Sequence, residues 1–342
     1  MKYIDLRSDT VTHPTDLMRE AMFKAEVGDD VYEDDVTTNE LEKYAAELLG
    51  KEKSLFTPSG TFANQLAVFT HCNRGEEVIL SDSCHIVQHE AGGSAVIAGV
   101  QLRTIESKNG RMPLEKIEEA IRKEEDIHYP KTSLICLENA FSDGSVLDIS
   151  YMREVYELAK KYKLGVHLDG ARYFNAQVAL KAEPEEMAKY VDSINICLSK
   201  GLCAPIGSLL VGSEAFISKA RIKRKILGGG MRQVGILAAP GLIALKEMRL
   251  RLDQDHENAK YLSKKLSQIP GIEPVEEEPS INMVFFKITN DDLKKKMAPE
   301  EFLKHDILIN PEEFGLMRFV THYYVGKKEI DTVVEIIESI AR

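Results

Sequence analysis

Short apolar runs alternate with segments of helical periodicity between residues 54 and about 212. The runs are nearly continuous in apolar residues, which is typical of parallel strands that are covered on both faces. We predict strands at five of them, namely 77–80, 100–105, 133–137, 165–168 and 193–198. Residues 207–211 could form an added edge or neighbouring strand. This alternation predicts an α/β fold with helices on both faces of a mostly parallel sheet.

The C-terminal third has a different pattern. An apolar helical segment, 233–246, follows three consecutive glycines, and an amphipathic linker helix is expected at 253–268. The last 70 or so residues predict a small α+β unit, with strands at 282–288, 307–310 and 316–320 and helices at 299–305 and 328–340.

The first 50 residues are polar and contain one clear helical pattern, at 38–49. We therefore expect three parts in the chain. Residues 1–50 would pack on the large domain or on a partner subunit, residues 51–250 would form the large domain, and residues 251–342 the small domain.

Composition and charge narrow the function. The 342 residues are 44% hydrophobic and 29% charged, which is ordinary for a soluble globular protein. The net charge is −11, so binding to a nucleic-acid backbone is not expected.

Location and redox state can also be predicted. The first ten residues are polar and the longest apolar stretch, 236–245, is far shorter than the ~20 residues that span a bilayer, so neither a signal peptide nor a membrane span is expected. The five cysteines are scattered and form no Cys-x-x-Cys pair. This favours reduced thiols in a cytoplasmic protein over disulfides or a zinc site.

Several common α/β enzyme motifs are absent. The chain has no Gly-x-Gly-x-x-Gly, no Gly-x4-Gly-Lys-Ser/Thr, no His-Glu-x-x-His and no Gly-x-Ser-x-Gly. The chain therefore lacks the usual signatures of four classes, namely a dinucleotide-binding fold, a P-loop nucleotidase, a zinc protease and an α/β-hydrolase.

Polar residues do follow two consecutive predicted strands. The run HLDGAR at 167–172 ends one strand, with Asp169 at its mouth, and Lys200, in Ser-Lys-Gly, follows Asp169 by 31 residues. Ligands of open α/β sheets bind outside the carboxyl ends of the strands, so the two could share a pocket. A lysine in this place is a candidate for a Schiff base, and an aspartate there can hold a protonated pyridine nitrogen. A structural ion pair explains the two residues about equally well.

Two further elements could bind the same ligand. Gly60 and Thr61 open a predicted helix at 64–71, where free N–H groups could hold an anion, although a simple N-cap is the commoner case. His85 follows the strand near residue 80. Its flat ring could stack on an aromatic cofactor, although a lone histidine is more often structural.

Together these elements resemble the fold-type I pyridoxal-phosphate (PLP) enzymes, and most closely the threonine aldolases. The matching segments are spread over nearly the whole chain, and their order is highly specific. They are DLRSDTVT at 5–12, VGDDVY at 27–32, SGT and NQ within 59–65, HLDGAR at 167–172, CLSKGL at 197–202, LGGGMRQ at 227–233 and RFVTH at 318–322.

The resemblance implies a large mostly parallel α/β/α domain, a small C-terminal α+β domain and PLP as cofactor. By position, Lys200 would carry PLP covalently and Asp169 would bind the pyridine N–H. Arg172 would lie near the 3′-oxygen and the substrate carboxylate. His85 would stack on the ring, and the cofactor phosphate would be held by Gly60 and Thr61.

The remaining roles are implied in the same way. Arg232 would reach a phosphate, that of the neighbouring subunit, and Ser8 and Arg318 would bind the substrate carboxylate. His128 would lie near the β-hydroxyl, and either His85 or His128 could take the β-hydroxyl proton. No metal ligand is implied, although a structural cation is left open. We expect a homodimer at least, and a homotetramer in full.

The activity implied is cleavage of L-threonine or L-allo-threonine to glycine and acetaldehyde. The chain departs from the family pattern at 138–144, ENAFSDG in place of a Glu-Asn-Thr-His sequence, and at His89, where an aromatic ring is expected. The threo or erythro preference, the β-substituent and the physiological direction therefore stay open.

Other activities on the same scaffold are a β-eliminating lyase, a racemase or an aminotransferase. A PLP-binding protein without turnover is the alternative from another class. His85 and Arg318 argue against it, because mere binding would not require them.

Overall fold

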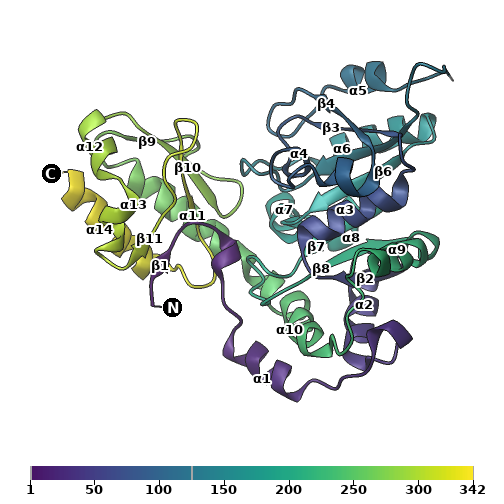
Figure 1. The fold of residues 1–342 in the computed structure, drawn as a ribbon. Coiled ribbons are helices and arrows are strands. Elements are labelled where there is room, and N and C mark those ends of the chain that lie inside the picture. Colours follow the sequence, from purple (N-terminus) through teal and green to yellow (C-terminus); the bar gives the residue numbers. More distant parts are fainter. Residues whose placement is uncertain (1, 125, 342) are drawn as a thin grey trace.

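The computed structural model describes residues 2–124 and 126–341. Its centre is a seven-stranded sheet (Figure 1). The strand order is β2 (Lys53–Thr57), β8 (Ser208–Gly212), β7 (Ser193–Cys197), β6 (Gly165–Gly170), β5 (Thr132–Glu138), β3 (Glu77–Ser81) and β4 (Gln101–Ile105). The five predicted strands are present as β3 to β7. The additional strand expected at 207–211 is β8, which runs antiparallel to both of its neighbours.

Helices cover both faces of this sheet, as the alternating pattern predicts. One face packs against α3 (Gly60–His71) and α9 (Glu214–Ile226). The other face packs against a larger set, which is α2 (Val36–Leu48), α5 (Leu114–Ala120), α6 (Ile149–Lys161), α7 (Tyr173–Leu180), α8 (Pro184–Ala188) and α10 (Gly235–Lys246). The largest hydrophobic core lies between this second layer and the sheet. Since both faces are buried, the strands are apolar throughout.

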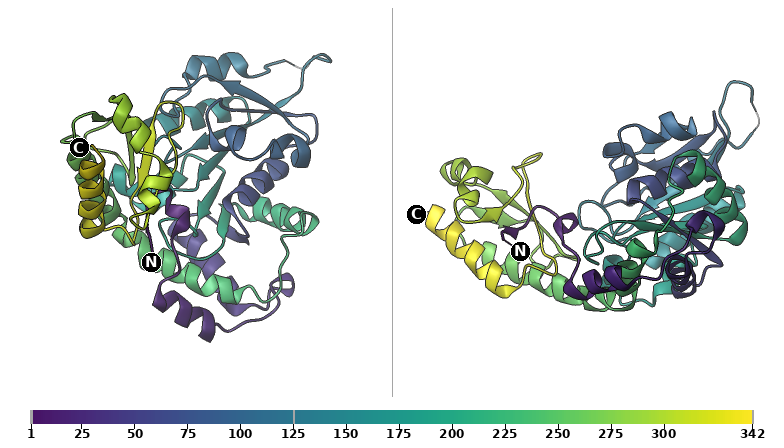
Figure 2. Two further views of the ribbon diagram at one scale, coloured as in Figure 1. Left: turned by 60° about the vertical axis from the view of Figure 1, so that its left-hand side comes forward. Right: turned by 60° about the horizontal axis from the view of Figure 1, so that its bottom comes forward.

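A second, smaller sheet lies to one side of the first (Figures 1 and 2). It is antiparallel, in the order β12 (Met317–Val320), β10 (Met283–Ile288) and β9 (Ile272–Pro274). Its helices are α11 (Leu252–Leu266), α12 (Asp291–Lys296), α13 (Pro299–Leu303) and α14 (Lys327–Ala341). These elements share a separate hydrophobic core, and α11 leads into them from the large sheet (Figure 1).

The N-terminal segment contains more structure than its sequence predicts. In addition to α2 it has β1 (Ile4–Asp5) and α1 (Asp16–Lys24), so the expectation of one helix is wrong. β1 pairs with β11 (Ile307–Leu308) beside the small sheet, and α1 packs on α10 below the large sheet. The polar sequence of α1 hides the helix, because Met18 is the one residue of α1 that is buried. The domain limits at residues 50 and 250 stay a prediction.

In the part of the chain that the structure describes, no helix combines the length and the apolar character needed to cross a bilayer. The five cysteines are all unpaired and buried.

Candidate active site

The polar groups meet where β5, β6 and β7 end. These strands are parallel neighbours, and their register places Glu138 beside Asp169 and Asp169 beside Asn195. The Asp169 carboxylate is buried and accepts hydrogen bonds from three N–H groups. They are Asn64 Nδ2 at 2.7 Å, the Ala171 backbone N–H at 3.0 Å and Asn195 Nδ2 at 3.3 Å. This packing fixes the direction in which the carboxylate faces.

Lys200 lies just beyond the end of β7, the strand next to Asp169. Its carbonyl oxygen accepts a hydrogen bond from Thr12 Oγ1 at 2.7 Å, which ties the N-terminal segment to the turn that carries the lysine. The lysine is half-buried.

Arg172 and Asp9 form the principal ion pair of this region. The guanidinium donates two parallel hydrogen bonds to the carboxylate, from Nε at 2.9 Å and from Nη2 at 2.6 Å. Burial alone would raise the pKa of Asp9, but the charge and hydrogen bonds of Arg172, together with the charge of Lys200, outweigh it and lower the pKa to about 2. The N-terminal segment is therefore anchored beside Arg172 and Lys200.

The small sheet contributes Arg318, which lies on β12. Its Nη2 donates to the carbonyl oxygen of Arg7 at 3.3 Å, next to Ser8. Burial and the nearby charge of Arg172 both lower the pKa of Arg318. The two arginines and Ser8 thus come from three separate parts of the chain to one place.

The start of α3 lies at the same edge of the sheet. α3 begins at Gly60, four residues earlier than predicted, and Ser59 is its N-cap, with Oγ accepting from the Phe62 N–H at 3.2 Å. The N-cap that the sequence suggests at this helix start is therefore present, at Ser59. A Cβ built on Gly60 would come within 2.6 Å of Cys197 Sγ, so only glycine fits this close approach. The backbone N–H groups of this first turn form an anion-binding helix terminus that suits a phosphate.

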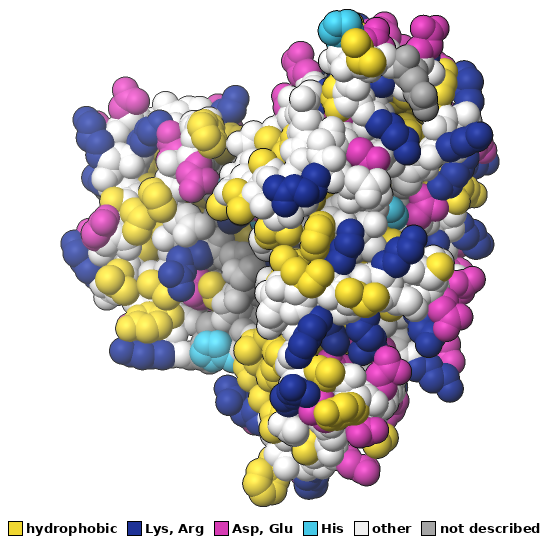
Figure 3. Space-filling model, turned by 45° about the vertical axis from the view of Figure 1, so that its right-hand side comes forward, with side chains coloured by type: hydrophobic (Ala, Val, Ile, Leu, Met, Phe, Trp, Pro, Cys, Tyr) yellow, Lys and Arg dark blue, Asp and Glu magenta, His cyan; other side chains and the backbone are white. Residues whose placement is uncertain are grey.

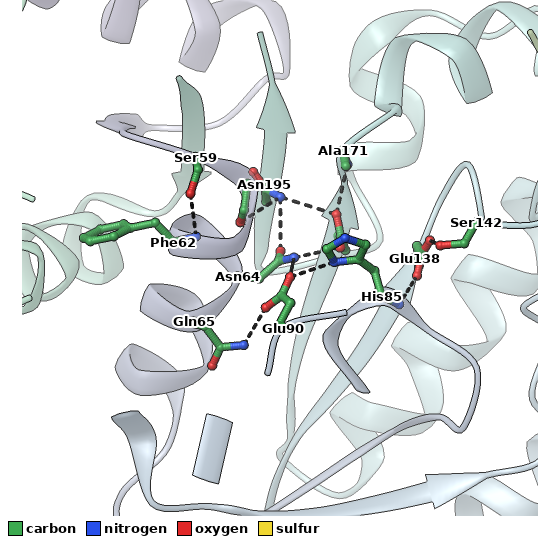
Figure 4. Close-up of polar contacts among 12 residues, drawn as sticks. Ser59, Phe62, Asn64, Gln65, His85, Glu90, Glu138, Ser142, Ala171 and Asn195 are labelled. Carbon is green, nitrogen blue, oxygen red and sulfur yellow. Dashed lines mark hydrogen bonds and ion pairs between the residues drawn. The ribbon is translucent and has the colours of Figure 1, made fainter. Parts of the chain in front are cut away.

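His85 begins the short helix α4 (His85–Gln88), after β3. Its Nδ1 lies 2.9 Å from Glu90 Oε1, and its backbone N–H donates to Glu138 Oε2 at 2.7 Å (Figure 4). The hydrogen bond with Glu90 raises the pKa of His85 against the opposing effect of burial. Burial and the nearby charge of Asp169 raise the pKa of Glu138.

The same groups could in principle attract a cation, because ligand atoms of His85, Glu90 and Asp169 lie within 4.8 Å of one another. The Asn64 amide N–H already lies between the two carboxylates and donates to both. An N–H group between two carboxylates stabilises their negative charges. It also occupies lone pairs of both carboxylates that a metal ion at this point would need. The chemistry of these residues fits an aromatic, phosphorylated cofactor better than a metal ion.

The structure does not bring two of the predicted residues into this group. His128 lies on an exposed loop four residues before β5 begins, at the opposite edge of the sheet, and hydrogen-bonds to Asp126. Arg232 is half-exposed and pairs with Asp29 at 2.8 Å. Their proposed roles therefore require a second copy of the chain. His89 is exposed, with its ring 5.4 Å from that of His85.

Several residues of the site were given no role from the sequence. They are Asp9, Asn64, Glu90, Glu138 and Asn195, all of them buried. A buried polar side chain has to find a partner, so polar residues inside apolar runs were the available signal. Asn195 in the run SINIC carries that signal, whereas Glu90 lies in a turn and carries none.

Comparison with known proteins identifies the family. The beta-eliminating lyase family model matches residues 5–289. The chain is 45% identical to the low-specificity L-threonine aldolase of Escherichia coli K12, over 96% of this chain and 97% of that protein. It is also 45% identical to the low-specificity L-threonine aldolase 1 of Arabidopsis thaliana, over 96% and 94%.

Solved structures agree in fold. The threonine aldolase of Leishmania major superposes with a TM-score of 0.83 at 19% identity, covering 99% of this chain and all of that one. A serine palmitoyltransferase from Sphingomonas wittichii has a TM-score of 0.76 at 14% identity, covering 99% and 87%. The fold is that of the fold-type I enzymes. The chain belongs to the beta-eliminating lyase family, and within it to the threonine aldolases, which are PLP-dependent lyases.

Proposed function

We propose that this protein is a PLP-dependent aldolase that cleaves L-threonine and L-allo-threonine to glycine and acetaldehyde. The observation that carries the proposal is the meeting of Asp169, Lys200 and Arg172 at one sheet edge, with Ser8 and Arg318 beside them. A carboxylate, a lysine and two arginines in one place suit an aromatic cofactor and an amino-acid substrate together. The names of the most similar relatives support the same reaction.

The residues present fit PLP. Lys200 would bind it covalently, Asp169 would hold the proton on its ring nitrogen, and the first turn of α3, with Gly60 and Thr61, would hold its phosphate. His85 would lie against the ring. When bound, PLP withdraws electrons from the substrate α-carbon and so lowers the energy of the negative charge that forms there.

The arginines orient the substrate. The guanidinium of Arg318 can bind the α-carboxylate with two parallel N–H donors, and Ser8 can add a hydroxyl donor. Arg172 is held in place by Asp9, which leaves the rest of its fork to face the substrate. A fixed carboxylate sets the rotation about the Cα–N bond, and this decides which bond of the α-carbon is activated.

His85 can remove the proton of the β-hydroxyl. As the O–H bond breaks, its electron pair forms the carbonyl of acetaldehyde, and the electron pair of the Cα–Cβ bond stays on the α-carbon. That carbon then takes up a proton and becomes the methylene of glycine. His128 could take the hydroxyl proton only from another subunit, because the fold places it far from its own chain's site.

We propose that the protein forms at least a homodimer, and that the complete assembly is a homotetramer. Exposed apolar side chains gather on α1, on the segment that follows it and on α10, including Phe23, Tyr32 and Ile236. Figure 3 shows hydrophobic atoms exposed over the lower part of the molecule, where Figure 1 places these helices. Arg232 is close to the same region and half-exposed, and it would have to exchange its pair with Asp29 for a partner's phosphate.

The test is a product analysis. The purified protein is incubated with PLP and with L-threonine, L-allo-threonine, L-serine or β-phenylserine, in parallel reactions without and with a keto acid, and glycine and aldehyde are quantified together. The proposal predicts equal amounts of glycine and aldehyde. Ammonia with a keto acid would indicate β-elimination, and inversion at the α-carbon without cleavage would indicate a racemase. Turnover only with an added keto acid would indicate an aminotransferase, and each of these three outcomes refutes the aldolase.

A further inference from the structure

Glu90 is a buried acid that the proposed reaction has not used. Its side chain is fully enclosed, and three N–H groups surround it (Figure 4). His85 Nδ1 and Asn64 Nδ2 lie 2.9 and 2.8 Å from Oε1, and Gln65 Nε2 lies 2.5 Å from Oε2.

The direction of both amides is fixed by their other contacts. The Gln65 carbonyl oxygen accepts from Ser94 Oγ at 3.0 Å, so its nitrogen faces Glu90. The Asn64 carbonyl oxygen accepts from Asn195 Nδ2 at 3.1 Å, so its nitrogen faces the carboxylates of Glu90 and Asp169. Two of the three groups on Glu90 are therefore donors, and the carboxylate is the acceptor throughout.

His167 also indicates that the Asn64 nitrogen faces the two carboxylates. His167 Nε2 lies 3.2 Å from the Asn64 carbonyl oxygen, and its Nδ1 lies 2.8 Å from Ser193 Oγ. Burial lowers the pKa of His167 to about 4, so its ring is neutral at pH 7. The proton must then be on Nε2, where it donates to Asn64.

The contact with Glu90 sets the tautomer of His85. A carboxylate oxygen at 2.9 Å requires the proton on Nδ1, which leaves the lone pair of the neutral ring on Nε2. We infer that Glu90 is a positioning residue that holds His85 with Nδ1 protonated and with Nε2 as the base for the β-hydroxyl proton. This inference rests on the aldolase proposed above.

Other charged groups also face His85. Asp169 from β6 favours the protonated ring, as Glu90 does, and Lys200 beyond β7 opposes it. Glu138 from β5 binds the His85 backbone N–H, and His89 lies beside the ring on the same turn. Glu90 has the largest effect on the pKa of His85, because among the described residues it is the one whose side chain hydrogen-bonds to the ring.

The decisive variant is Glu90→Gln, which keeps the shape and removes the charge. Without that charge His85 loses its proton more readily, so the acid-side midpoint of kcat/KM against pH should move down by about one pH unit or more. The glutamine N–H can also face Nδ1 and favour the wrong tautomer, so the pH-independent rate should fall by about 10- to 1000-fold.

Glu77→Gln is the matched control. Glu77 is equally buried, but it lies at the start of β3, at the other edge of the sheet, where it pairs with Arg103 and Arg122. This variant should leave the midpoint where it is. A Glu90→Gln enzyme with a lowered rate but the wild-type midpoint would show a merely structural role and refute the inference.

A proton NMR measurement tests the pairing without turnover. The PLP-loaded wild-type protein should show a far-downfield imidazole N–H signal that is absent from His85→Asn and retained in Glu77→Gln. If Glu90→Gln does not fold, the wild type and His85→Asn still decide the matter, since a wild type without this signal contradicts the pairing. If the wild type shows the signal but releases no glycine, the aldolase proposal fails and the pairing stands.

Discussion

Replacing Asp9 by Asn tests how strongly the N-terminal segment is fastened to the active site. The carboxylate is buried, and it accepts two hydrogen bonds from Arg172 and one from Asn282, at 3.4 Å. Burial opposes its ionisation, but the charge of Arg172 lowers the pKa from an ordinary 3.8 to about 2. Since each tenfold change in an acidity constant is worth about 1.4 kcal/mol, the carboxylate stabilises the fold by about 2 kcal/mol at pH 7.

The sign of the pH dependence follows. The pKa of Asp9 is lower in the folded than in the unfolded chain, so its contribution is complete well above pH 4 and is lost as pH falls toward 2. The free energy of unfolding of Asp9→Asn, from urea titration at a fixed protein concentration, should be about 2 kcal/mol below wild type at pH 7. At pH 3 the difference should be about half as large.

The KM for the amino-acid substrate should also rise, because Arg172 is released from its place. Glu20→Gln, which removes an exposed pair with Lys24 on α1, is the control and should change neither quantity measurably. If Asp9→Asn is as stable as wild type at pH 7, or if the deficit does not shrink in acid, the ion pair does not fasten the segment as argued.

Three further predictions follow from the site. Gly60→Ala should raise the apparent Kd for PLP at least about tenfold, measured by cofactor absorbance, because the added Cβ would meet Cys197 Sγ at 2.6 Å; unchanged affinity would place the phosphate elsewhere. Asp169→Asn should still bind PLP but slow cleavage by orders of magnitude, and near-normal turnover would mean that the ring proton is held otherwise. Lys200→Ala and Arg232→Ala, each inactive alone, should recover up to about half the activity of their mixed dimers when subunits exchange. No recovery despite demonstrated exchange would place Arg232 outside a shared site.

The order of the strands explains why the meeting of Asp169 and Lys200 could be predicted from the sequence. Asp169 and Lys200 end consecutive apolar strands, and consecutive parallel strands are usually neighbours, so their meeting follows from the pattern. The close approach of Gly60 to Cys197 was not predicted, because it depends on how α3 packs against β7.

The remaining residues depend on contacts between distant parts of the chain. Asp9 meets Arg172 across 163 positions, and Glu90 meets Asn64 across 26, with no periodicity that relates them. The resemblance named His128 by its position, but the fold places it at the opposite edge of the sheet from Asp169. Its part in the reaction stays a prediction that a second subunit would have to satisfy.

The most direct test of the account is the attachment of the cofactor. Borohydride reduction of the PLP-loaded protein, followed by peptide mapping, should find the pyridoxyl label on the peptide that contains Lys200. Lys200→Ala should lose the visible absorbance of the bound cofactor and nearly all release of glycine from L-threonine. A label on Lys219 or Lys223, or a Lys200→Ala protein that still cleaves threonine, would contradict the site described here.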